Sequence, residues 1–115
     1  MPHAALDSAE IEAEREGRVK RVRTALGVTA FGINELRLPP GASGSLHDES
    51  ATGQEEVYYV LQGSGTMAVD GDEVELRPGR YVFVAAGTPR QVTAGDDGLA
   101  WLCVGCPPGA YRPRS

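Results

Sequence analysis

Five glycines in the C-terminal half recur every eight residues, and this spacing constrains the fold more than any other feature of the chain. They are Gly63, Gly71, Gly79, Gly87 and Gly95. Short runs of strand-forming residues lie between them, and Asp70-Gly71 is a strong signal for a tight hairpin. We therefore predict an all-β fold with strands near 57–62, 65–70, 73–77, 80–85, 90–94 and 99–104.

The N-terminal third carries weaker signals. Asp7 followed by Glu10 resembles a capping box, which predicts a short helix over residues 8–16. The basic run 18–23 predicts an exposed or edge strand, and residues 29–38 predict another strand. The small polar residues of 42–54 predict a loop. The predicted organisation is an N-terminal tail with a short helix (1–17), one β-barrel (18–106) and a C-terminal tail (107–115).

The charge of the chain bears on its partners. The 115 residues carry a net charge of −5, which disfavours nucleic acid and anionic membranes as partners. Eight acidic residues and no Lys or Arg lie between Asp48 and Glu75, so these carboxylates either form a solvated rim or point into a cavity. No signal peptide and no apolar run of membrane-spanning length is visible, and we expect a cytoplasmic protein.

Two segments carry residues at the spacing of a known pair of motifs. The first is Gly41-x5-His47-x-Glu49, followed by Glu56-x6-Gly63, and the second is Gly79-x5-Ala85-x-Gly87-x2-Arg90. Together they resemble the two motifs of the cupin superfamily, in its small single-domain form, over roughly residues 29–105. The resemblance implies a single cupin barrel, a double-stranded β-helix or jelly roll. It does not imply one activity, because cupins include isomerases, dioxygenases, decarboxylases and binding domains.

The positions that hold the metal in metal-binding cupins depart from the family pattern. The resemblance implies a site of two His and one Glu from the first motif and one His from the second. His47 and Glu56 match, whereas Glu49 and Arg90 stand where histidines are expected. Arginine offers no lone pair to a cation, and its charge opposes one. A tightly bound metal is therefore not favoured; if a divalent metal ion is present, its ligands would be His47, Glu49 and Glu56.

The same motif positions predict an ion pair inside the barrel. The strand period of two places Tyr58 on the same face as Glu56, and the second motif points Arg90 inward. A buried carboxylate and a buried guanidinium are each costly alone, so we predict that Glu56 and Arg90 pair where relatives place a metal. The predicted ligand-binding residues are His47, Glu56, Tyr58 and Arg90. The plainer alternatives are a solvated His47, an exposed Glu49, a purely structural ion pair and a Tyr58 that only fills the core.

The leading hypothesis is a small-molecule-binding cupin without a tightly bound metal, whose catalytic ability stays open. The first alternative is a metal-dependent cupin enzyme of isomerase, dioxygenase or decarboxylase type acting on a small polar metabolite. The second is a structural or interaction domain with an empty barrel. The resemblance also implies a homodimer, to which we expect residues 18–26 or Trp101 to contribute.

Cys103 and Cys106 form a CxxC that closes a strand, which predicts structural thiols.

Overall fold

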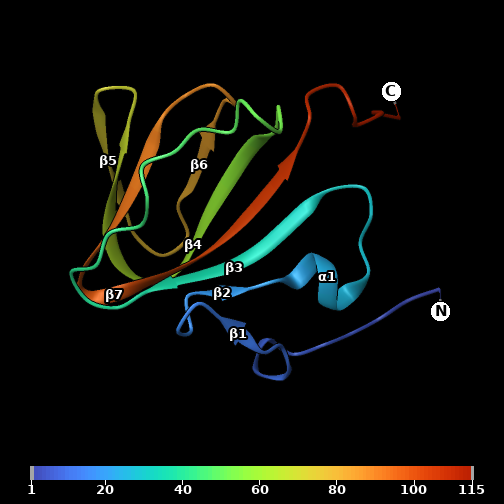
Figure 1. Cartoon of the computed structure of the whole chain (residues 1–115), viewed down its shortest axis with the longest axis horizontal. Coiled ribbons are helices and arrows are strands. Elements are labelled where there is room, and N and C mark those ends of the chain that lie inside the picture. The colour runs from blue at the N-terminus through green and yellow to red at the C-terminus, as the bar shows by residue number, and fades with distance from the viewer. Residues whose placement is uncertain (1, 115) are drawn as a thin grey trace.

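The computed structural model of the chain describes residues 2–114, and most of their regular structure is β-sheet (Figure 1). The elements are a 3₁₀ turn at Ser8–Glu10, β1 (Ala13–Glu14), β2 (Val19–Lys20), α1 (Val22–Leu26), β3 (Gly32–Leu38), β4 (Glu55–Val69), β5 (Asp72–Leu76), β6 (Tyr81–Val84) and β7 (Arg90–Cys106). The all-β prediction is confirmed. Met1 and Ser115, the ends of the two predicted tails, lie outside the described residues.

Two long antiparallel strands, β4 and β7, pair side by side along most of their length and form the frame of the barrel. The first half of β4 pairs with β6 and the second half with β5. The C-terminal half of β7 also pairs with β3, which continues through β2 to β1 at the edge of the sheet. Each long strand therefore contributes to both walls of the barrel, as a jelly roll requires.

The periodic glycines have two different roles. Gly71 and Gly79 lie in turns with φ of 82° and 88°, where a residue without Cβ is favoured. Gly63 and Gly95 lie inside β4 and β7, so the predicted pairs of strands 57–62 with 65–70 and 90–94 with 99–104 are each one continuous strand. The prediction was wrong here because an interior glycine also allows a strand to bend, and the β4–β7 register shifts on both sides of Gln62 and Gly63.

The N-terminal region differs from its prediction. The helix predicted over 8–16 is limited to the 3₁₀ turn, and Asp7 makes no side-chain capping hydrogen bond. The short α-helix lies at Val22–Leu26 instead and ends at Gly27, whose φ is 80°. The predicted strand over 18–23 is limited to Val19–Lys20. The apolar stripe of residues 8–16 is too thin to hold a helix against the barrel, and residues 13–20 instead form a hairpin on β3.

The core lies between the two walls. It consists of apolar side chains from β3, β4, β5, β6 and β7, with Met67, Val60 and Val84 the most deeply buried of them. Trp101 is 6% exposed and belongs to this core. Arg90 is 0% exposed and is the one charged residue that is fully buried among residues 2–114.

Candidate functional site

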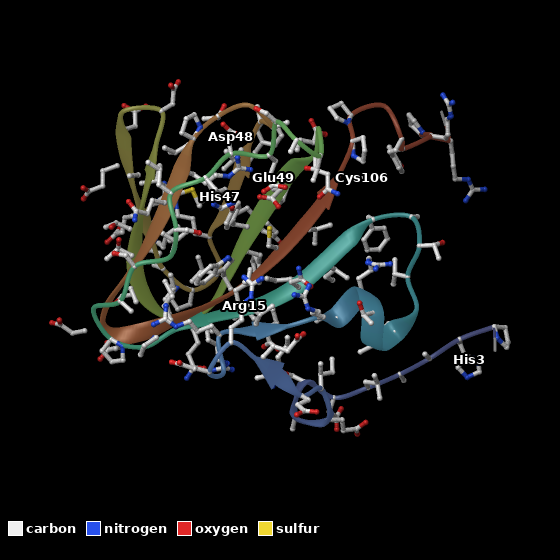
Figure 2. The ribbon with its side chains drawn as sticks, in the orientation of Figure 1. His3, Arg15, His47, Asp48, Glu49 and Cys106 are labelled. Carbon is white, nitrogen blue, oxygen red and sulfur yellow. The ribbon has the colours of Figure 1, made fainter. Side chains whose placement is uncertain are left out.

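The interior of the barrel opens into a cavity of about 540 Å³. All four predicted ligand-binding residues line it, and so does Glu49. Glu56 and Tyr58 come from β4, Arg90 from the start of β7, and His47 and Glu49 from the loop between β3 and β4. Figure 2 labels His47 and Glu49 on this loop, and Arg15 below them comes from the turn between β1 and β2.

Arg90, Tyr58 and Glu56 form a hydrogen-bonded triangle at the base of the cavity. Nη2 of Arg90 donates to Oε1 of Glu56 over 2.9 Å, and Nε donates to the Tyr58 hydroxyl over 3.3 Å. The Tyr58 hydroxyl in turn donates to the same Glu56 oxygen over 3.0 Å. The predicted Glu56–Arg90 pair is therefore confirmed as a contact. The Glu56 side chain is only 13% exposed, so the pair is largely shielded from water.

These contacts and the surrounding burial change the acidities of the site. Burial lowers the pKa of Arg90, but Tyr58 and Glu56 outweigh that effect and raise it, so the guanidinium stays charged. Burial is the main cause that raises the pKa of Tyr58, with a contribution from the charge of Glu56. Tyr58 therefore remains a neutral hydrogen-bond donor at physiological pH and does not act as a ready base.

The backbone of Arg90 positions His47. The two residues exchange both backbone hydrogen bonds, at 3.1 and 2.9 Å, so the predicted loop here is held against β7. Nδ1 of His47 lies 3.2 Å from the carbonyl oxygen of Ser45. If Nδ1 donates to that carbonyl, Nε2 carries the lone pair of the neutral imidazole and can accept a hydrogen bond or ligate a cation. Nε2 lies 3.5 Å from Oε2 of Glu49.

Glu49 is less exposed than expected. Its side chain is 20% exposed, and Oε1 accepts a hydrogen bond from Thr52 over 2.9 Å. One donor atom each from His47, Glu49 and Glu56 lie within 4.8 Å of one another, a spacing that a divalent cation could bridge. The fit is incomplete, because the guanidinium of Arg90 already binds a Glu56 oxygen and adds a positive charge.

Four further arginines line the same cavity and were not predicted as site residues. Arg15, Arg18, Arg21 and Arg37, which we call the arginine rim, come from the β1–β2 hairpin, the residue that follows it, and β3. Arg18 and Arg21 lie in the run predicted as an exposed or edge strand. Arg15 lies in the predicted helix 8–16, and Arg37 lies in the predicted strand 29–38. The basic run 18–23 was the only sequence signal for a cluster of arginines. The pairing of β2 with β3 determines that these side chains lie at the cavity.

Trp101 also lines the cavity, and its burial in the core agrees with the expectation that it fills the core. Its expected contribution to a dimer interface stays a prediction. Among residues 2–114, the indole Nε1 of Trp101 is buried and has no hydrogen-bond acceptor.

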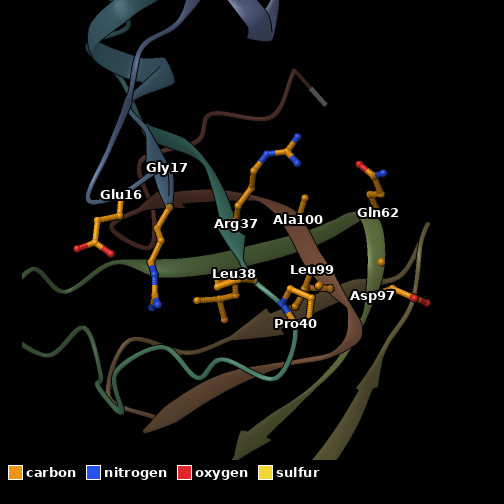
Figure 3. Close-up of a pocket in the computed structure, with 13 residues that line it drawn as sticks. Glu16, Gly17, Arg37, Leu38, Pro40, Gln62, Asp97, Leu99 and Ala100 are labelled. Carbon is orange, nitrogen blue, oxygen red and sulfur yellow. The ribbon is translucent and has the colours of Figure 1, made fainter.

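A second, smaller hollow of about 340 Å³ is shown in Figure 3, and it shares Arg18, Arg37 and Leu38 with the lining of the barrel cavity. Glu16 and Asp97 line it together with Arg37, so charges of both signs meet there. Gly63 of the first motif lines it, whereas His47, Glu49, Glu56 and Arg90 do not. Among residues 2–114, the helices are all too short or too polar to cross a membrane.

Three comparisons place this geometry among known proteins. An uncharacterised protein from Methanocaldococcus jannaschii is 32% identical over 81 residues, which are 70% of this chain and 63% of the relative. A Thermotoga maritima protein named oxalate-binding protein is 33% identical over 70 residues, 60% of this chain and 56% of the relative. This chain therefore spans about three fifths of the length of the curated relatives it matches.

The solved structure of a cupin protein from Bacteroides fragilis superposes with a TM-score of 0.83 at 23% identity, covering 100% of this chain and 92% of that chain. At this identity the likeness shows the fold alone. The family model described as "Cupin domain" matches residues 34–105, which include both motif segments. The chain belongs to the cupin family, and its fold is a single, mostly β-stranded cupin domain with one short helix.

Proposed function

We propose that this protein binds a small polar molecule in the barrel cavity without a tightly bound metal. The observation that carries the proposal is the triangle of Arg90, Tyr58 and Glu56 in the wall of a cavity of about 540 Å³. A volume of this size suits a small ligand. Arg90 is 0% exposed and uses three of its five N–H groups in hydrogen bonds to described residues, so it holds Glu56 and Tyr58 in place beside the cavity. The more exposed side chains of His47 and Glu49 are open to a ligand.

One relative supports a ligand-binding role but does not assign a ligand to this chain. The Thermotoga relative is named for binding oxalate, a small dicarboxylate. Because that match covers 60% of this chain at 33% identity, oxalate is a probe for the experiment and not an assigned ligand.

The experiment is a calorimetric and thermal-shift screen of small polar metabolites on protein treated with a chelator. A ligand at one hundred times its Kd adds about 2.7 kcal/mol of stability, which a thermal shift detects. We expect Tyr58→Phe to weaken binding of any hit, because it removes a hydroxyl that shares the triangle. Tyr59→Phe is the matched control, since Tyr59 lies on the opposite face of β4 and its ring contacts that of Tyr81 at a tilt of 41°. Hits that bind both variants equally, or only after metal is restored, would contradict the proposal.

Divalent-metal binding is the second candidate, and the spacing of His47, Glu49 and Glu56 favours it. These three residues would hold the ion, which would supply a Lewis acid to a substrate oxygen. The contact of His47 Nδ1 with the Ser45 carbonyl would help to aim Nε2 at the ion. Metal analysis of the purified protein separates the two candidates, because near-stoichiometric metal would favour this second one.

We propose further that the protein is a cytoplasmic homodimer that pairs through the outer face of β4 and β6. Val57 and Phe83 are cross-strand neighbours there, as are Tyr59 and Tyr81, and Tyr81 and Phe83 are 71% and 61% exposed. An exposed apolar patch of this kind is typical of an interface between subunits. The free thiols of Cys103 and Cys106 suit a reducing compartment.

A further inference from the structure

The charge of the cavity is opposite to the charge of the chain. Five arginines line the cavity, the four of the arginine rim and Arg90, against two glutamates, Glu49 and Glu56. The whole chain has a net charge of −5 and only 11 Lys and Arg. Nearly half of its basic side chains therefore surround one cavity, which attracts anions into an otherwise acidic molecule.

Among the described residues, two arginines of the rim have no carboxylate partner. Arg21 binds Glu14 over 2.6 Å, and Arg37 lies 3.9 Å from Glu35. Within residues 2–114, neither Arg15 nor Arg18 has a carboxylate oxygen within 4.0 Å, the separation that defines an ion pair. Their guanidinium groups are available to an anion that enters the cavity.

The backbone that carries Arg15 is unusual. Arg15 and Glu16 have φ of 52° and 60°, and Gly17 follows with 87°. The left-handed region is unfavourable for residues with a Cβ, so glycine or asparagine would form this hairpin turn with less strain. A strained turn beside a cavity is a feature of functional sites, and here it holds an arginine at the cavity wall.

We propose that Arg15 and Arg18 form an anion subsite, so that the ligand of this cavity is a small molecule bearing an oxyanion, either carboxylate or phosphate. The inference rests on the proposed ligand-binding function and specifies its chemical class. The two arginines bind the anionic group of the ligand. His47 and Glu49 from the β3–β4 loop, together with Glu56 from β4, face its remaining polar groups.

The test is isothermal titration at low ionic strength with oxalate, succinate and inorganic phosphate, beside the neutral amides oxamide and succinamide. We expect the full chain to bind at least one anion and to prefer it to the neutral probes. The Arg15→Gln/Arg18→Gln double variant should lose about tenfold or more in anion affinity. The matched control is Arg77→Gln/Arg112→Gln, which removes the same charge from exposed positions that do not line the cavity. Comparison of the affinities for oxalate and succinate with the affinity for inorganic phosphate identifies which oxyanion the cavity prefers.

Arg15→Gly distinguishes a binding residue from a structural one. Glycine relieves the left-handed turn, so the melting temperature should stay or rise while anion affinity falls. A lower melting temperature with unchanged anion affinity would overturn the inference.

Equal anion affinity in the double variant and its control would also overturn it, and the proposed ligand-binding function would stand. A preference of the wild-type protein for the neutral amides would likewise overturn the anion subsite and leave the proposed ligand-binding function standing. If the wild-type protein binds none of the five probes, the anion subsite is refuted; the wider metabolite screen then decides separately whether the cavity binds anything.

Discussion

The guanidinium of Arg90 lies 2.9 Å from the carboxylate of Glu56 in the wall of the barrel cavity. The Tyr58 hydroxyl bridges the two, and the Arg90 side chain is 0% exposed. A permanent protein cation therefore neutralises the charge of this largely buried carboxylate. The ion pair of Arg90 and Glu56 should therefore contribute to the free energy of unfolding.

Replacing Arg90 with alanine should strongly destabilise the protein. The change leaves Glu56 without its cation in a largely buried position, and losing one partner of a buried pair typically costs about 3–5 kcal/mol. The Glu56→Gln/Arg90→Met double variant should recover part of the loss, because no charge stays buried. Urea unfolding of the three proteins measures the free energies. A change below about 0.5 kcal/mol for Arg90→Ala would show that the pair contributes little.

Gly63→Ala should destabilise the barrel more than the same change in a turn. A Cβ at Gly63 would collide with the backbone carbonyl of Gly98, and the φ of 87° is unfavourable for alanine. Overpacking and left-handed strain together predict a loss of about 3 kcal/mol or more. Gly71→Ala is the control, since its φ is 82° but nothing lies within 4 Å, and strain alone predicts about 1–2 kcal/mol. Equal losses in urea unfolding would contradict the assigned role of Gly63.

Alkaline pH should destabilise the fold through Cys103. Burial is the main cause that raises the pKa of this thiol, and the charge of Glu56 adds to it. The folded thiol therefore stays protonated at a pH where the unfolded one ionises. Its contribution is complete below the ordinary thiol pKa of about 8.5 and is lost as the pH rises above it, by up to about 1.4 kcal/mol per pH unit.

Unfolding free energies measured from pH 7 to pH 10 test this sign, the range being roughly centred on the ordinary thiol pKa. Cys103→Ala should be less stable at pH 7, because a buried side chain is shortened, but its stability should fall less above that pKa. Cys106→Ala, at a less buried position, should keep the wild-type slope. Parallel curves for the wild type and Cys103→Ala would refute the assignment.

Phe83→Lys should give a monomer if the outer face of β4 and β6 is the dimer interface. A charged side chain at this 61% exposed position would be desolvated between subunits, whereas it would be harmless on a free surface. Light scattering at micromolar concentration measures the mass. Tyr111→Lys, at a 79% exposed position in the C-terminal segment, should leave the mass unchanged. A wild-type protein with the mass of one chain would end the dimer proposal.

The sequence predicted the features that local spacing determines. The turns at Gly71 and Gly79 and the shared face of Glu56 and Tyr58 follow from residue type and the strand period. The pairing of His47 with the Arg90 backbone could not be predicted, because the small polar residues around His47 show no alternation. The arginine rim depends on a hairpin that folds onto β3, which is a tertiary contact between segments of weak local preference.

Arg90→His should create divalent-metal affinity beyond that of the natural protein. The substitution removes the cation that opposes a metal and supplies an imidazole at the position where the second cupin motif would have a histidine. His47, Glu49 and Glu56 already lie within bridging distance of one another, so a fourth donor would complete the site. Titration calorimetry with Mn²⁺ should show a gain of about tenfold or more over the wild type. Arg90→Gln is the control, because it removes the charge without adding a ligand of this type. If both variants gain equally, charge removal alone explains the result; if Arg90→His gains nothing, residue 90 does not face the ligand cluster in a way that allows coordination.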